Sequence, residues 1–267
     1  MGSLGLYFRL IGASVRSQMQ YRLSFLMLSL AAFMHTSVEL AGVWALFARF
    51  KTLRGWRLPE VALFFGIITI ALAVGDAFAR CFDVLPRLIR SGAFDRMLLR
   101  PRSVALQLVG HELTLFRVGR ASVGLAVLLW AAAALGLHWT AARVALLVMA
   151  ILGGVCLFSG LWVLQATLSF WTTEGLEIMN AFTYGGCETA QYPLAIYRPW
   201  FRKFFTFVVP LACVSYFPGL AVLGRHDTAL GSPDWFGWVS PAIGLVFLLA
   251  ALQVWRFGIR HYTSTGS

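Results

Sequence analysis

The chain is poor in charge, and above all in negative charge. Of its 267 residues, 12% are charged and 59% are hydrophobic, and 11 acidic residues stand against 22 lysines and arginines. Soluble domains carry about a quarter charged residues, so this composition excludes an ordinary soluble fold and favours a lipid bilayer as the solvent. The basic residues lie in short stretches between apolar runs, which is typical of loops at a membrane surface rather than of a nucleic-acid-binding face.

The sequence also lacks the motifs of common enzyme classes. It contains no GxxxxGK[ST] phosphate-binding loop and no GxSxG turn, and the "HEL" at residues 111–113 lacks the second histidine of a zinc-binding HExxH. We therefore expect no catalytic residue, no metal site and no cofactor in this chain. The cysteines show no CxxC spacing and lie mostly in apolar surroundings, which favours buried free thiols. They are Cys81, Cys156, Cys187 and Cys213.

Long apolar runs are what the sequence has in abundance. Most are about 20 residues or longer, enough for a helix to cross a hydrocarbon core about 30 Å thick. They predict an all-α integral membrane protein with six transmembrane helices in a single domain over residues 1–267. Before them, apolar residues recur at three- and four-residue steps through residues 3–20, which predicts an amphipathic helix in the membrane interface. The clear spans are residues 23–47, 61–78, 118–137, 144–171 and 238–257.

The segment before the last span allows two topologies, and both place the two termini in the cytoplasm. In the first, residues 173–188 form the fifth span and the proline-broken region 189–225 re-enters from the outer side. In the second, residues 205–223 form the fifth span. The first leaves 13 of the 22 basic residues inside and the second leaves 16, because the basic residues between 198 and 203 change sides. The positive-inside rule therefore favours the second, whereas broken helices buried in protein at membrane depth allow the first.

Polar residues within or at the ends of the apolar segments are the first candidates for function. A charge at the centre of a membrane costs about 2.5–3.5 kcal/mol or more, so such residues usually face an interior, a partner or water. For Asp76, an ion pair with Arg80 one helical turn later is the simpler interpretation. For Glu39, a structural and a functional role are equally open. The candidates for a polar pathway or a cationic-substrate site are Glu39, Asp76, Asn180 and Glu188.

A basic stretch between the second and third spans is the second candidate. Residues 80–102 hold six basic and two acidic residues, the strongest positive-inside signal in the chain. Within it, "SGAFDRMLLRPRS" begins with a Ser-Gly break, and its proline disfavours a helical residue before it. The phenylalanine, the methionine and the first leucine can share one helical face. The pattern predicts a short amphipathic helix at the cytoplasmic surface, and it leaves open whether this helix lies on lipid or docks a partner.

This stretch resembles a known family. "SGAFDRMLLRPRS" is similar to the loop after the second span in permeases of type-2 ABC exporters, in the branch with a G-x-F-D-x-x-L-L-R-P pattern. "SFWTTEG" (residues 169–175) and the proline-rich stretch at residues 192–224 resemble the same branch, so the resemblance covers most of the chain. It implies a coupling helix within the region 83–103 and a re-entrant outer element before the last span. The resemblance thus favours the first topology, against the arginine count. Residues 185–188 have no clear counterpart in the family.

The resemblance also implies partners. Two permeases, identical or homologous, would pair and dock two copies of a separate ATPase that binds ATP and magnesium. The chain would then be a non-enzymatic subunit of an exporter in the bacterial inner membrane, moving an amphipathic or hydrophobic substrate for which a cationic, drug-like molecule and a lipid are both open. The prolines implied to shape the re-entrant part are Pro193, Pro210 and Pro218. The residues implied to couple to the ATPase are Gly92, Phe94, Asp95, Leu98, Leu99, Arg100, Pro101 and Glu174.

Two other classes of function compete with this interpretation. A membrane-embedded lipid-modifying enzyme would need a cluster of catalytic side chains, which the sequence does not show. A secondary transporter often has inverted repeats or paired broken helices, and the sequence has one broken segment.

Overall fold

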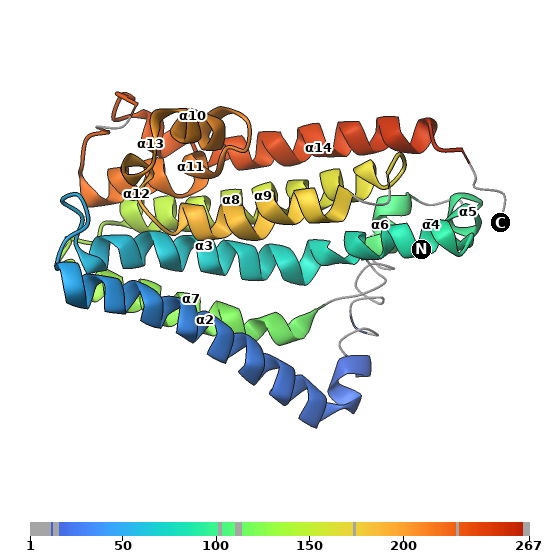
Figure 1. The fold of residues 1–267 in the computed structure, drawn as a ribbon, viewed down its shortest axis with the longest axis horizontal. Helices are drawn as coiled ribbons and strands as arrows, with labels where there is room; N and C mark the ends of the chain where they lie inside the picture. The colour runs from blue at the N-terminus through green and yellow to red at the C-terminus, as the bar shows by residue number, and fades with distance from the viewer. Residues whose placement is uncertain are drawn as a thin grey trace.

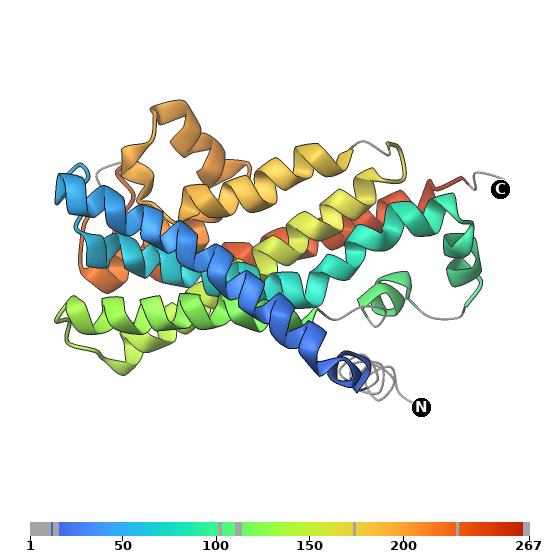
Figure 2. The same ribbon diagram turned by 60° about the horizontal axis from the view of Figure 1, so that its bottom comes forward.

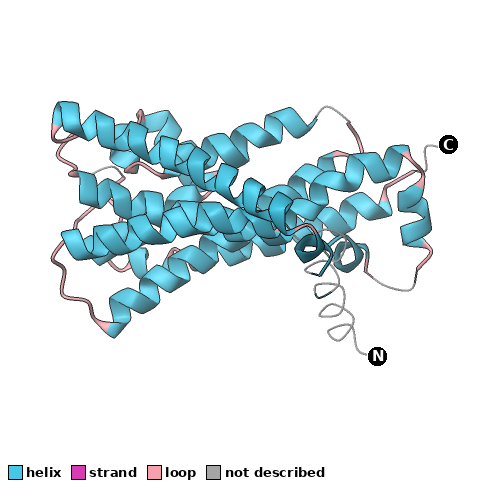
Figure 3. Cartoon of the chain, turned by 90° about the horizontal axis from the view of Figure 1, so that it is seen from below, coloured by secondary structure: helices cyan, strands magenta, loops and turns pink. Residues whose placement is uncertain are grey.

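The computed structural model describes residues 12, 16–100, 103–109, 114–172, 175–227 and 230–263. Throughout these ranges the regular structure is helical, apart from one isolated bridge between Leu53 and Trp56. The long helices pack side by side into an elongated bundle, and the loops gather at its two ends (Figure 1, Figure 3). The long helices are α2 (Arg22–Phe50), α3 (Leu58–Ala79), α7 (Val118–Ala134), α8 (Ala141–Leu168), α9 (Gly175–Ala190) and α14 (Ala242–Arg260). The short ones are η1 (Arg80–Val84), α4 (Leu85–Arg90), α5 (Ala93–Leu98), α6 (Val104–Val109), η2 (Leu115–Arg117), η3 (Leu194–Ile196), α10 (Pro199–Phe207), α11 (Leu211–Val214), α12 (Tyr216–Leu223) and α13 (Phe236–Val239).

The number of membrane-length helices matches the composition. Five helices are long and apolar enough to cross a membrane, or six if the bent pair formed by α10 and α11–α12 is one span. The prediction of an all-α, multi-pass membrane protein is therefore confirmed. At 29 residues and 1.5 Å per residue, α2 is longer than a hydrocarbon core is thick, so it tilts or projects from the membrane.

The predicted start of the last span is wrong by a few residues. A single helix from residue 238 was expected, but α13 ends at Val239 and α14 begins only at Ala242. Pro241 explains the break, because proline has no N–H with which to continue the helical hydrogen bonds of α13. The short α13 packs on α12.

Close helix packing at the centre of the bundle depends on small residues. The helix α8 packs against α14, α3 and α9, while α3 also packs against α7. Where α8 crosses α14, Gly153 and Gly244 face one another, and a Cβ at either position would collide with the backbone of the other helix or of Pro241. In a membrane, where lipid tails are as apolar as leucine, such close backbone approach is a main source of helix association.

The two ends of the bundle carry different elements. The short helices α10 to α13 lie at the same end as the α2–α3 loop, whereas α4, α5 and the C-terminus lie at the opposite end (Figure 1, Figure 2). Between α10 and α11–α12 the chain bends by 71°. The last residue of this region, Arg225, forms an ion pair with Glu60 at the start of α3 at 2.6 Å and stacks over Trp56 in the α2–α3 loop.

The predicted interfacial helix lies mostly outside the described residues. Of residues 3–20, residue 12 and residues 16–20 are described, and they are helical. The Gln18 side chain accepts a hydrogen bond from the backbone N–H of Leu115 at 3.1 Å, so this segment contacts the start of the third span.

Candidate functional site

The predicted coupling region, residues 83–103, forms a short helical turn-back over α4 and α5 at the end of the bundle opposite α10 to α13. The helices α4 and α5 meet at Gly92, which has a φ of 64°. This left-handed conformation favours glycine, because a Cβ would clash with the backbone. The expected break at the Ser-Gly pair is therefore present, and it lets the chain turn from α4 into α5.

The inner face of α5 is anchored in an aromatic cluster. Phe94 is fully buried, with its ring centroid 5.5 Å from that of Phe170 after α8 and 5.0 Å from that of Tyr262 after α14. Phe170 also packs on Trp255 of α14 at 5.3 Å. Next to this cluster, Asp95 interacts with Tyr262, and burial together with the Asp95 carboxylate raises the pKa of the Tyr262 hydroxyl. The cluster links α5 to the ends of two long helices.

The C-terminal end of α5 and the residues directly after it carry exposed apolar and basic side chains. Leu99 is 86% exposed and Leu98 is 37% exposed, although the sequence pattern placed Leu98 on the same face as the buried Phe94. Arg96 and Arg100 are exposed beside these leucines. Exposed leucine between arginines at the tip of a bundle is suited to contact with another protein. Two further predicted coupling residues, Pro101 and Glu174, lie outside the described residues.

A polar cavity of about 410 Å³ lies within the bundle, between α2, α3, α7 and α9. Its walls reach from Thr69 at the middle of α3 to Arg80 directly after that helix, so it occupies the half of the bundle nearer to α5. The lining residues are Ala32, His35, Glu39, Thr69, Leu72, Arg80, Arg117, Arg120, Tyr184, Cys187, Glu188 and Gln191.

Asp76 is fully buried behind this cavity and is held by arginines. One of its carboxylate oxygens lies 2.6 Å from Nε of Arg117 and the other lies 3.7 Å from Nη1 of Arg80. The contacts are ion pairs rather than well-aligned hydrogen bonds. Arg80 also pairs with Asp83 at 3.5 Å, and Tyr184 on α9 lines the same cavity. The expected pairing with Arg80 is present, and the closer partner Arg117 comes from another helix.

Glu39 on α2 is likewise paired. One carboxylate oxygen lies 3.5 Å from Nη2 of Arg120 and 3.1 Å from Nδ1 of His35. Arg120 donates a further hydrogen bond from Nε to the Thr36 hydroxyl at 3.3 Å. These contacts join α7 to α2 within the membrane-spanning part of both helices. An unpaired charge there would cost free energy, and the ion pair lowers that cost.

The other two predicted pathway residues lie on α9. Glu188 is exposed at the edge of the cavity, and Asn180 is exposed but does not line it. The structure thus brings Glu39 and Glu188 to one cavity and places Asp76 directly behind it. The three arginines on its wall were not among the predicted site residues: Arg80 and Arg117 lie next to predicted spans, and Arg120 lies near the start of the predicted third span.

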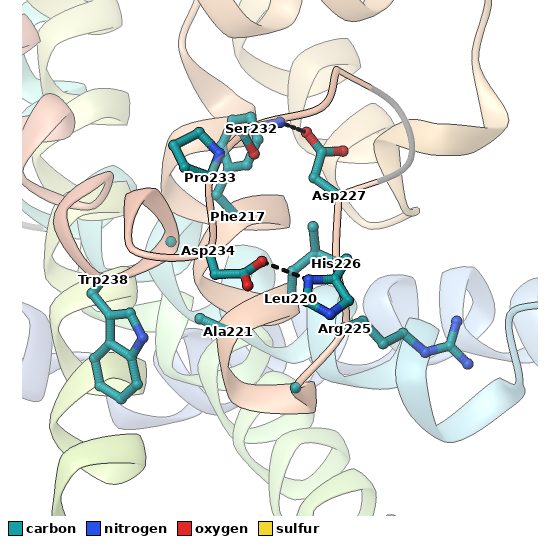
Figure 4. Close-up of a pocket in the computed structure, with 12 residues that line it drawn as sticks. Phe217, Leu220, Ala221, Arg225, His226, Asp227, Ser232, Pro233, Asp234 and Trp238 are labelled. Atoms are coloured by element: carbon teal, nitrogen blue, oxygen red, sulfur yellow. Dashed lines mark hydrogen bonds and ion pairs between the residues drawn. The ribbon is translucent and has the colours of Figure 1, made fainter.

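A second, smaller pocket of about 170 Å³ lies at the opposite end, between α12, the following loop and α13 (Figure 4). Its polar groups contact one another. His226 lies 2.8 Å from a carboxylate oxygen of Asp234, and Asp227 accepts hydrogen bonds from the backbone N–H groups of Leu230 and Ser232 and from the hydroxyl of Tyr216. These contacts order the loop, and they leave few polar groups directed at a ligand.

Several long apolar helices, a polar cavity between them and an exposed helical tip define a multi-pass membrane protein built around an internal polar site. The model of the family described as "ABC-2 family transporter protein" matches residues 33–266. The chain therefore belongs to the ABC-2 transporter family, whose membrane components lack an ATPase domain of their own and generally work with an ATPase partner. Comparisons with curated proteins and with solved structures find no match.

Proposed function

We propose that the chain is the transmembrane subunit of an ATP-driven exporter in the bacterial inner membrane, with both termini in the cytoplasm. Two such permeases, identical or homologous, would pair and dock two copies of a separate ATPase that binds ATP and magnesium. The family membership supports a transport role with an ATPase partner. The direction of transport and the pairing of permeases rest on the resemblance of "SGAFDRMLLRPRS" to the exporter branch.

The observation that carries this proposal is helix α5, which has a buried and an exposed part. Its buried Phe94 connects it to the ends of α8 and α14, while Leu98 at its last position and Leu99 directly after it are exposed at its C-terminal end. A docking helix needs an exposed surface that contacts the ATPase and a packed surface that contacts the transmembrane helices, because a movement of the ATPase reaches those helices only through both contacts. Phe94 would therefore act in coupling as an internal anchor rather than as an ATPase contact.

The basic character of this end indicates the kind of partner surface. Arg87, Arg90, Arg96 and Arg100 are exposed there, and the carboxylate nearby, Asp95, interacts with Tyr262. Opposite charges across an interface steer association and fix its register. We expect an acidic rim around an apolar groove on the ATPase, with the groove receiving Leu98 and Leu99.

The first of the two topologies fits the proposal better. With α9 as the fifth span, α10 to α12 would enter the membrane from the outer side and return to it. The 71° bend and the contact of Arg225 with Glu60 and Trp56 support this, since they bring the end of α12 back to the α2–α3 loop. Amphipathic α10, with exposed Trp200 and Phe207, is suited to the outer membrane interface.

The test is co-purification of the permease with the ATPase partner that the proposal requires. Replacing Leu98 and Leu99 with serine removes exposed apolar area and should leave folding intact, so we expect the amount of bound ATPase to fall by about tenfold. The matched control replaces Val208 and Val239, which are exposed at the opposite end, with serine. Equal ATPase recovery from all three proteins would contradict the docking role of α5.

A further inference from the structure

The arginines on the wall of the 410 Å³ cavity are all paired within the chain. Each guanidinium group lies 2.6–3.7 Å from a carboxylate oxygen. The pairs are Arg117–Asp76, Arg80–Asp76, Arg80–Asp83 and Arg120–Glu39. The cavity therefore offers no free positive charge to a ligand.

Glu188 on α9 differs from these carboxylates. It lines the cavity, yet it forms no ion pair with an arginine, lysine or histidine in the part of the chain that the structure describes. When it is counted with the paired groups, three guanidinium groups stand against four carboxylates, which leaves one negative charge. His35 contacts Glu39 and adds a positive charge only when it is protonated. The unbalanced charge of the cavity is thus negative, and Glu188 carries it.

This carboxylate belongs to the membrane-spanning part of the bundle. Glu188 is the third residue from the end of α9, and α9 ends beside the middle of α3 along the long axis of the bundle (Figure 1, Figure 2). Thr69 and Leu72, from the middle of α3, line the same cavity. A carboxylate at such a depth is costly unless water or a positive charge accompanies it. A cation bound in the cavity would lower this cost.

The other acidic candidates chosen from the sequence are not available to a cation. Asp76 is fully buried and enclosed by two arginines, and Glu39 is shared between Arg120 and His35. To reach either of them, a cationic ligand would have to displace an arginine that the fold holds in place. At Glu188 it would displace only water.

The surroundings of Glu188 suit an organic cation. Tyr184 precedes it by four residues on α9, so both side chains project from the same face of the helix, and both line the cavity. The face of an aromatic ring attracts an organic cation. Ala32 on α2 and Leu72 on α3 add apolar walls, against which the carbon groups of such a cation can pack.

We propose that this cavity binds a monovalent organic cation, an amine or a quaternary ammonium, whose positive charge pairs with the carboxylate of Glu188. The ring of Tyr184 would contact the same charged group, and the apolar part of the ligand would lie against Leu72 and Ala32. The claim that this cation is a transported substrate rests on the proposed function. The binding site itself does not depend on it.

The experiment measures binding to the purified full-length chain in a neutral detergent by isothermal titration calorimetry, with no ATPase present. The probes are tetraphenylphosphonium and tetraphenylborate, which have nearly the same shape and opposite charge. We expect Glu188→Gln to weaken binding of the phosphonium about tenfold, an effect between those of an exposed and a buried ion pair. The same variant should not weaken binding of the borate. Equal loss for both ions, or unchanged phosphonium binding in folded Glu188→Gln, would overturn the proposal.

Two further variants separate the charge of Glu188 from its shape and from the net charge of the chain. Glu188→Asp keeps the carboxylate and should retain most of the phosphonium binding. Asp234→Asn removes an exposed carboxylate at the opposite end of the bundle and should change nothing. Light scattering on the same samples tests whether Glu188 instead pairs with a second permease. Loss of a dimer in Glu188→Gln with unchanged phosphonium binding would assign the carboxylate to that contact and overturn the proposal. Because no ATPase takes part, the result is independent of whether α5 docks one.

Discussion

The two ends of the bundle differ in how their charged and apolar surface side chains are arranged. At the end with α10 to α13, charged groups contact one another, as His226 does with Asp234 and Arg225 does with Glu60. At the other end, Leu99 directly after α5 is exposed beside the exposed Arg96 and Arg100, while the buried Phe94 packs α5 against the bundle. At the first end these polar groups are paired within the chain, and exposed apolar side chains such as Trp200 and Phe207 lie on amphipathic α10, which is suited to a membrane interface. The second presents a surface that another protein can complete, and this difference is the reason to place the ATPase there.

The polar cavity between the ends adds a third kind of environment. Asp76 is buried there and Arg117 and Arg120 are largely buried, so their pairing is energetically important, whereas the exposed pair at the α13 end contributes little. The buried pairs at the cavity and the exposed pair near α13 both contain charged residues, so the presence of charge alone does not identify a functional region in this chain. Burial of the charge decides how much its pairing contributes to stability.

The largest expected effect comes from breaking the buried pairing at Asp76. Asp76→Ala leaves Arg117 without its closest partner in a buried site, so we expect a loss of about 3–5 kcal/mol in the free energy of unfolding. Asp234→Ala, which removes an exposed partner of His226, should change it by about 0.5 kcal/mol or less. Thermal unfolding in detergent measures both. Equal shifts in the two variants would remove the distinction between the buried and exposed pairs.

A smaller effect on stability, with a specific effect on coupling, is expected at Phe94. Phe94→Leu keeps most of the buried volume but loses the ring contacts with Phe170 and Tyr262, which costs about 1 kcal/mol. The matched variant is Phe217→Leu, a buried phenylalanine that packs on Phe236 at the opposite end. We expect similar melting temperatures but reduced permease-dependent ATP hydrolysis for Phe94→Leu alone. Equal hydrolysis by the two variants would show that the aromatic cluster plays no part in coupling.

Much of the fold could be predicted, because long apolar runs in the sequence identify membrane-spanning helices. The first four spans lie within a few residues of their predicted positions, since an apolar run must be helical to satisfy its backbone in lipid. The break before α14 was missed, because the pattern of apolar residues continues across Pro241. The segment α9 was ambiguous, because its 16 residues fall short of a full span and carry several polar side chains.

The candidate site could be predicted only where its contacts are local. The pair Asp76–Arg80 follows from helical spacing, and the Gly92 turn follows from the sequence around it. The contacts of Arg117 with Asp76 and of Arg120 with Glu39 join different helices. Nothing in one sequence says which face of α7 meets α2 and α3. The ion pairs between different helices around the cavity therefore follow only from the packing.

The most direct test of the docking role of α5 is site-specific photocrosslinking in intact cells. A photoreactive amino acid placed at Leu99 or at Trp235, both exposed but at opposite ends of the bundle, reports which end contacts the ATPase. The account predicts a crosslinked product of permease and ATPase from position 99 and none from position 235. A product from position 235, with none from position 99, would contradict it.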